Sequence, residues 1–125
     1  MINQIPSIEI EKYIKNNSKC VLLDVRTKEE WIIDGKPDGE KIGLKTYFIP
    51  IQFADKSFNI NFEKEFEKLN IEKDYEILTI CMGGVRSQAA ADFLTKKNYK
   101  CTNISDGFLG NHQNLGWKNS KLPCK

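Results

Sequence analysis

The chain has 125 residues, and its 17 Lys and 2 Arg against 17 acidic residues leave a formal charge of +2. This length suits one domain over residues 1–125, and Lys and Glu are interspersed, so no basic face for nucleic acid is expected. One His and four Cys without a C-x-x-C pair argue against a zinc site, and no stretch is apolar enough to cross a membrane.

The first part of the chain predicts a helix, a buried strand and a second helix. Ser7 can act as the N-cap of a helix over residues 8–16. Residues 20–25 (C-V-L-L-D-V) form a nearly continuous apolar run, which is typical of a strand buried on both faces. Thr27 and Glu30 have the spacing of a capping box, so a second helix is expected to begin there.

The middle of the chain predicts a loop, two further strands and a helix between them. Residues 34–44 contain three glycines and a proline, and are expected to form a loop. Residues 46–49 read as a strand that Pro50 ends. From Asn61 onward apolar residues recur at helical spacing, and residues 76–80 again read as a buried strand.

The last part of the chain predicts a helix over residues 86–97 and a weaker strand over residues 100–105. Strands and helices therefore alternate, which indicates an α/β domain around a mostly parallel sheet. Ligands of such sheets bind beyond the carboxyl ends of the strands. The segment that follows residues 76–80 is therefore the first place to look for a site.

A cysteine and two nearby glycines follow that strand, in the sequence C-M-G-G-V-R-S. Glycines let the backbone curl until several N–H groups point at one atom, and the next helix adds its free amides and the positive end of its dipole. Such a cradle stabilises a thiolate on Cys81, or the terminal sulfur of a persulfide. The alternative is that Cys81 is an ordinary small buried side chain. The predicted site loop comprises Cys81, Met82, Gly83, Gly84, Val85, Arg86 and Ser87.

The chain resembles the rhodanese-like (sulfurtransferase) family in several segments that follow the family's order. Residues 22–31 (L-L-D-V-R-T-K-E-E-W) are similar to its D-V-R-x-x-x-E-[WFY] motif, and Ile49-Pro50 stands where the family has I-P after its second strand. Residues 81–87 are similar to its C-x-x-G-x-R-S loop, and residues 105–108 (S-D-G-F) to its late D-G-[FW] turn. The resemblance implies a three-layer α/β/α fold with a mostly parallel central sheet of about five strands.

The resemblance also implies an enzyme, a sulfurtransferase in which Cys81 takes sulfane sulfur from a donor as a persulfide and passes it to a thiophilic acceptor. It implies a small donor such as thiosulfate or a polysulfide, and cyanide, a thiol or a carrier protein as acceptor. It implies no metal and no organic cofactor. Met82 and Gly83 are neutral where family members that use thiosulfate often carry basic side chains, which favours another donor.

The length of the loop separates this chemistry from others on related scaffolds. From Cys81 to Arg86 the pattern is C-x4-R, one residue shorter than the C-x5-R loop of cysteine phosphatases and some arsenate reductases. A shorter loop suits a single sulfur atom better than a phosphate. Those enzymes remain alternatives, as does a non-catalytic rhodanese-fold module that binds a protein partner.

Five polar or charged residues are predicted to support the loop. Arg86 is expected to hold it through a carboxylate, or to attract an anionic donor. Asp24 ends a strand at the same edge of the sheet and is expected to accept hydrogen bonds from loop amides or from Arg86. Arg26 and Glu30 are spaced to pair across the start of a helix. Ser87 either donates its hydroxyl to the sulfur or caps the helix.

The other three cysteines carry weaker signals. Cys20 and Cys101 begin strands at the opposite end of the sheet and are expected to be inert core thiols. Cys124 is next to last and is expected to be mobile, either as an incidental thiol or as one that resolves the persulfide. The residues after Met1 do not read as a signal peptide, so we expect a cytoplasmic protein with free thiols.

Overall fold

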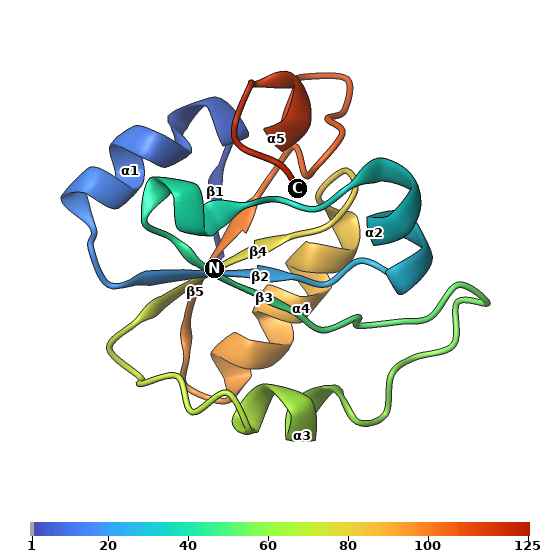
Figure 1. Cartoon of the computed structure of the whole chain (residues 1–125). Helices are drawn as coiled ribbons and strands as arrows, with labels where there is room; N and C mark the ends of the chain where they lie inside the picture. Colours follow the sequence, from blue (N-terminus) through green and yellow to red (C-terminus); the bar gives the residue numbers. More distant parts are fainter. Residues whose placement is uncertain (1) are drawn as a thin grey trace.

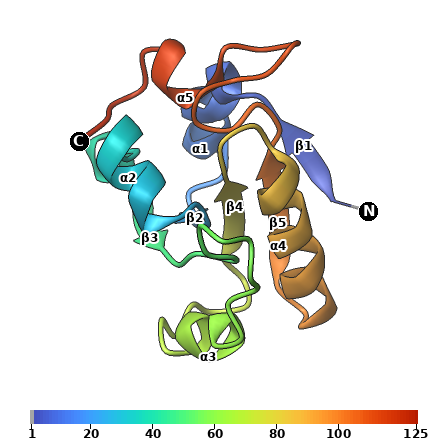
Figure 2. The ribbon, with the colours of Figure 1, turned by 90° about the vertical axis from the view of Figure 1, so that its right-hand side faces the viewer.

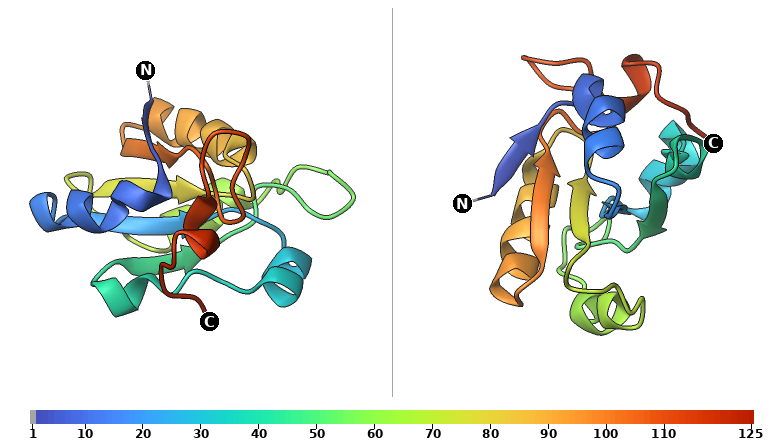
Figure 3. Two further views of the ribbon diagram at one scale, coloured as in Figure 1. Left: turned by 90° about the horizontal axis from the view of Figure 1, so that it is seen from above. Right: turned by 90° about the vertical axis from the view of Figure 1, so that its left-hand side faces the viewer.

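The computed structural model describes residues 2–125, and within them five strands form one sheet in the order β1-β5-β4-β2-β3. Every neighbouring pair of strands is parallel, as Figures 2 and 3 show. All residues of β2 and β4 are buried, because helices cover both faces of a parallel sheet. The strands are β1 (Asn3–Ile5), β2 (Cys20–Asp24), β3 (Lys45–Phe48), β4 (Glu76–Ile80) and β5 (Lys100–Ile104).

Helices on the two faces of the sheet complete three layers (Figure 1). Ile10 of α1 and Trp117 of α5 pack on one face, and Phe66 of α3 and Leu94 of α4 pack on the other. The helices are α1 (Ile10–Asn16), α2 (Lys28–Asp34), α3 (Phe62–Glu67), α4 (Val85–Lys96) and α5 (Gly116–Asn119), with two short 3-10 turns, η1 (Ser7–Glu9) and η2 (Gly39–Ile42). The expected three-layer α/β/α fold with a five-stranded parallel sheet is confirmed.

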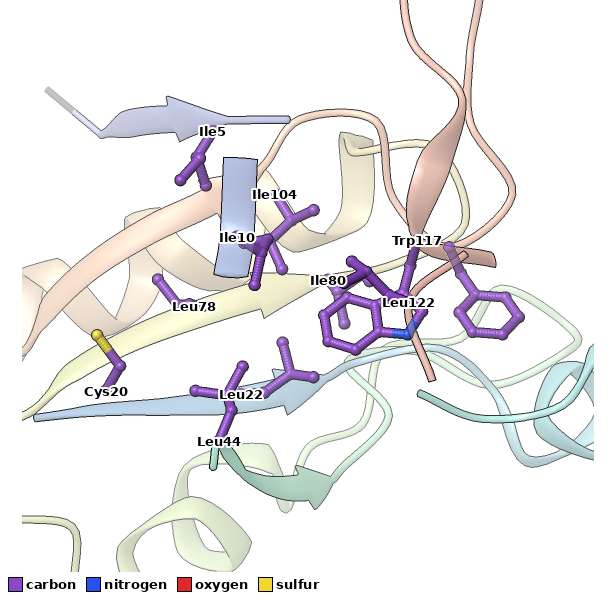
Figure 4. Close-up of a cluster of buried hydrophobic side chains, with 11 residues drawn as sticks. Ile5, Ile10, Cys20, Leu22, Leu44, Leu78, Ile80, Ile104, Trp117 and Leu122 are labelled. Atoms are coloured by element: carbon purple, nitrogen blue, oxygen red, sulfur yellow. The ribbon is translucent and has the colours of Figure 1, made fainter. Parts of the chain in front are cut away.

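The core on the face of α1 and α5 centres on Trp117, which is fully buried (Figure 4). Its indole N–H donates to the Pro123 carbonyl at 2.8 Å, so its one polar atom has a partner. Leu22 and Leu78 reach the same cluster from β2 and β4. This packing fixes the carboxyl ends of the two central strands, where the predicted loop begins.

Most predicted elements are present, with ends shifted by a residue or two. The capping box is confirmed, because the Thr27 hydroxyl accepts from the Glu30 amide at 3.1 Å while the Glu30 carboxylate accepts from the Thr27 amide at 3.0 Å. The N-cap role expected for Ser7 is wrong. Its amide and its hydroxyl both donate to buried Asp106, at 3.0 and 2.9 Å, and the η1 turn precedes the helix.

The C-terminal residues are held in place, so the mobility expected for Cys124 is wrong. Cys124 forms an antiparallel bridge with Pro37, and Lys36 and Lys125 exchange two backbone hydrogen bonds of 2.9 and 2.8 Å. Figure 2 shows this end of the chain beside α2. Among residues 2–125 no helix is both long and apolar enough to cross a membrane.

Candidate active site

Cys81 directly follows β4, at the carboxyl edge of the sheet, and its loop leads into α4. The side chain is 1% exposed. The backbone N–H of Gly84 and the hydroxyl of Ser87 both donate to its sulfur, each at 3.2 Å. Of the two roles considered for Ser87, the contact with sulfur is therefore the one observed, since α4 has Gly84 as its N-cap and no side-chain cap. Two hydrogen-bond donors from the loop and α4 therefore converge on the Cys81 sulfur.

The curl of the loop depends on glycine at two positions. Gly84 has φ +107°, and a Cβ there would lie 2.3 Å from the backbone oxygen of Ser105. On the facing segment after β5, Gly107 has φ +64°, and a Cβ there would lie 2.4 Å from the backbone oxygen of Met82. No side chain fits such spacings, so the site loop and the segment after β5 touch backbone to backbone.

The same contact carries two backbone hydrogen bonds. The N–H of Phe108 donates to the carbonyl of Cys81 at 2.8 Å, and the N–H of Leu109 donates to the carbonyl of Met82 at 3.1 Å. These carbonyls therefore face the segment after β5. The loop is positioned from behind by a segment more than 20 residues away in the sequence.

Arg86 joins the site loop to α2 through Glu30. Its two terminal nitrogens donate to the two carboxylate oxygens of Glu30, at 2.7 and 2.8 Å. The Thr27 amide and hydroxyl donate to one of those oxygens at 3.0 Å each. Burial alone would raise the pKa of Glu30, but hydrogen bonds from Arg86 and Thr27 outweigh it and lower that pKa to about 2. Of the two roles expected for Arg86, the contact with a carboxylate is the one that the structure shows.

The expected pair between Arg26 and Glu30 is wrong. Arg26 is fully buried, and its Nε and Nη2 donate to the carboxylate of Asp24 at distances of 2.9–3.1 Å. Its guanidinium also donates to the Gly35 carbonyl and lies 4.1 Å from the ring centre of Phe108. Arg26 lies in the bend between β2 and α2, two residues after the strand-end carboxylate that it binds. The expectation that Asp24 accepts from loop amides or from Arg86 is therefore wrong, because its carboxylate accepts instead from the backbone and side chain of Arg26. Burial pushes the pKa of Asp24 upward, and the hydrogen bonds from Arg26 oppose that rise.

The remaining predicted loop residues differ in their exposure. Met82 and Gly83 are partly buried, whereas the Val85 side chain is 83% exposed at the start of α4.

Cys20 and Cys101 lie at the other end of the sheet, and burial raises the pKa of each thiol to about 11. Both thiols are therefore protonated near neutral pH, as expected for unreactive cysteines.

Sequence reasoning missed Asn103, which is buried in β5 and whose side-chain N–H donates to the Gly84 carbonyl at 3.0 Å. The signal was present but weak: an amide among buried residues of a strand needs a hydrogen-bond partner. It also missed Asn111, which lies in an exposed loop and whose side chain donates to the Gly83 carbonyl at 3.4 Å. Nothing in its sequence context sets that residue apart.

Acid is expected to weaken the tie between α2 and the site loop. Because the pKa of Glu30 is 4.5 in an unfolded chain and about 2 here, the ion pair stabilises the fold fully above pH 4.5. That contribution is lost as the pH falls from 4.5 toward 2. Glu30→Gln lacks this ion pair at every pH. Its free energy of unfolding, measured with urea at a series of pH values, should therefore fall less steeply in acid than that of wild type. The exposed neighbour Glu29→Gln is the control, and equal slopes in wild type and Glu30→Gln would contradict the prediction.

The fold and this loop define a class: parallel α/β proteins with a cysteine at the carboxyl edge of the sheet whose sulfur accepts hydrogen bonds from a loop amide and a hydroxyl. Comparison with known proteins agrees, since the model of the rhodanese-like domain family matches residues 9–113. A Rickettsia prowazekii protein, named uncharacterized protein RP600, is 39% identical over 125 residues, which cover 98% of this chain and 97% of that protein. The chain therefore belongs to the rhodanese-like domain family.

Two further proteins share both sequence and length with the chain. A sulfurtransferase of Allochromatium vinosum is 24% identical over 124 residues, which cover 98% of this chain and 94% of that protein. The crystal structure of Rv0390 from M. tuberculosis superposes with a TM-score of 0.84 at 27% identity, and the match covers 98% of this chain and 96% of the other. The fold described above is thus that of solved relatives along nearly the whole chain.

Proposed function

We propose that the protein is a sulfurtransferase in which Cys81 accepts sulfane sulfur as a persulfide and passes it to a thiophilic acceptor, cyanide or a thiol. The observation that carries this proposal is the pair of donors, Gly84 N–H and Ser87 hydroxyl, aimed at the Cys81 sulfur. The family and a distant relative that is named a sulfurtransferase support it.

The reaction needs two displacements at sulfur and no net oxidation. In the first, the Cys81 thiolate attacks the outer sulfur of the donor, the donor's bond to that sulfur breaks, and the donor leaves with the electron pair. In the second, the acceptor attacks the outer sulfur of the Cys81 persulfide, and the Cys81 thiolate is the leaving group. Because the Cys81 side chain is nearly buried, the acceptor reaches the outer sulfur rather than the inner one.

Transfer of sulfur fits the site better than transfer of phosphate. The loop has the C-x4-R length, and both terminal nitrogens of Arg86 are engaged by Glu30. A phosphatase loop instead needs its arginine free to bind two oxygens of the substrate. The pairing of Arg26 with Asp24 removes the other guanidinium in the same way. A donor with little negative charge, such as a thiol-bound persulfide or a polysulfide, suits this site better than thiosulfate, and a thiol or carrier protein suits it as acceptor.

We also propose that the protein works in a reducing compartment such as the cytoplasm. Its four cysteines, Cys20, Cys81, Cys101 and Cys124, are free thiols. A thiolate that must react with sulfane sulfur is kept reduced in such a compartment.

Sulfur loading tests the proposal. Incubation with a polysulfide or with thiosulfate is expected to add one sulfur to the intact mass, and cyanide is expected to remove it. Cys81→Ser should abolish the gain, and Cys101→Ser should keep it. If neither polysulfide nor thiosulfate loads Cys81, the enzyme proposal fails and the binding module replaces it. Turnover of an aryl phosphate by unloaded protein would favour the phosphatase instead.

A further inference from the structure

Two asparagine side chains from outside the site loop hold the carbonyl groups on both sides of Gly84. The Asn111 side-chain N–H donates to the Gly83 carbonyl at 3.4 Å, and that of Asn103 donates to the Gly84 carbonyl at 3.0 Å. With the two backbone bonds described above, each of the four carbonyls of residues 81–84 accepts a hydrogen bond from residues 103–111. These four carbonyls therefore all contact the segment 103–111.

The direction of these carbonyls determines where the amides point. The carbonyl and the N–H of one planar trans peptide point in opposite directions. Asn111 fixes the peptide between Gly83 and Gly84, and the N–H of that peptide is the one that donates to the Cys81 sulfur. Asn103 holds the next peptide, which joins Gly84 to Val85 at the first turn of α4, together with the Gln88 N–H, which donates to the same carbonyl at 3.3 Å.

The buried Asn103 amide is itself locked. Its side chain is 2% exposed, and its NH2 group also donates to the Gln4 side-chain oxygen at 2.9 Å. Its own oxygen accepts from the Thr79 hydroxyl at 3.4 Å. With a partner on each side the amide cannot reverse without losing both contacts. Strand β1, which carries Gln4, thus supports the site loop through β5.

We propose that Asn103 and Asn111 are positioning residues for Cys81, which hold the peptides on both sides of Gly84 so that the Gly84 N–H stays aimed at the sulfur and stabilises its anionic form. The sulfur is the thiolate before transfer and, if the proposed function holds, the persulfide after it. The positioning of the thiolate does not depend on the proposed function, whereas the positioning of the persulfide does.

A merely structural role for the asparagines would predict a loss of stability with no change at the sulfur. Asn59 provides the matched control, because it is also buried and its side-chain N–H also donates to a backbone carbonyl, that of Pro50, at 2.8 Å. None of its hydrogen bonds reaches the site loop. Asn59→Ala therefore removes a comparable bond from a comparable environment.

The test is the pH profile of Cys81 alkylation by iodoacetamide, followed on the Cys81 peptide by mass spectrometry. Asn103→Ala and Asn111→Ala are each expected to lower the alkylation rate at neutral pH about three- to tenfold and to move the profile to more alkaline pH. Asn59→Ala is expected to keep the wild-type profile even where it lowers the melting temperature. Profiles of both site variants that match wild type would overturn the proposal, whatever their melting temperatures.

Two further arms keep the test decisive. Asn103→Ser, which leaves a small polar group at this buried position but is too short to reach the Gly84 carbonyl, replaces Asn103→Ala if that variant does not fold, with the same expected shift. Sulfur loading separates this proposal from the one above. Site variants with the expected change in alkylation, beside wild type that never loads sulfur, contradict the sulfurtransferase alone. Wild type that loads sulfur, beside site variants with unchanged profiles, contradicts the positioning role alone.

Discussion

Gly84→Ala is expected to reduce the rate of sulfur loading on Cys81 about 100-fold or more. An alanine Cβ at this position would lie 2.3 Å from the backbone oxygen of Ser105, and φ is +107°. Ser105 cannot simply move away, because its N–H donates to the Ile5 carbonyl at 2.9 Å and so ties it to β1. The loop must shift instead, which takes the Gly84 N–H off the sulfur. A displacement of about 1 Å at a reacting group is enough for such a loss.

Two other glycines separate the causes of that effect. Gly83→Ala changes the neighbouring residue, where a Cβ would lie 3.6 Å from the Gly110 oxygen, an ordinary contact. Gly43→Ala has a comparable φ of +83° but meets nothing within 4 Å, so it carries the backbone strain without the clash. Both variants are expected to load sulfur at close to the wild-type rate. Loading of Gly84→Ala at the rate of Gly83→Ala would show that the close approach to Ser105 does not hold the loop.

Arg26→Lys is expected to lower the free energy of unfolding by about 3 kcal/mol, although the charge is conserved. Lys has no planar fork, so it cannot reproduce the contacts of Nε and Nη2 with Asp24 or the stacking on Phe108. Because Asp24 is fully buried, its carboxylate would lose hydrogen bonds with no water to replace them. Urea unfolding followed by tryptophan fluorescence measures the loss.

The same exchange at the other arginine provides the comparison. The pair of Arg86 and Glu30 is partly open to solvent, with both side chains 21% exposed, so Arg86→Lys should cost about 1 kcal/mol or less. Its main effect should be on sulfur loading, since the bidentate tie between the site loop and α2 is lost. Equal destabilisation by the two exchanges would mean that burial of the Arg26 pair does not matter for stability.

Much of the fold follows from local sequence patterns. The apolar run at 76–80 coincides with β4, and the capping box at Thr27 and Glu30 starts α2 where the spacing predicts. The short strand β1 was not predicted. It has only three residues, two of them exposed, and lies at the sheet edge, so it carries no apolar alternation. It exists because β5 offers it a free edge, which is a contact between residues about 100 positions apart.

The candidate site was also predicted only in part, because its loop is a local pattern and the partners of its charged residues are distant in the sequence. The loop around Cys81 has a local signature of strand, glycines and helix start, and the structure has that arrangement. The partners of its charged residues were not predictable by spacing. Arg26 stands four residues before Glu30, yet it binds Asp24, while Glu30 binds Arg86 from a distant helix. Side-chain direction and burial decide such pairings, and both depend on the assembled layers.

The 2 arginines, beside 17 lysines, illustrate what local sequence determines and what tertiary packing decides. Sequence alone places both in segments that resemble the rhodanese-like family, and it identifies the cysteine, the glycines and the alternation of strands and helices. All of these are properties of residues close together in the chain. Tertiary packing alone decides that Arg26 is sealed in the core, that Arg86 links the site loop to α2, and that Asn103 binds the Gly84 carbonyl. Those contacts join segments that meet only when the sheet forms, so no local pattern encodes them.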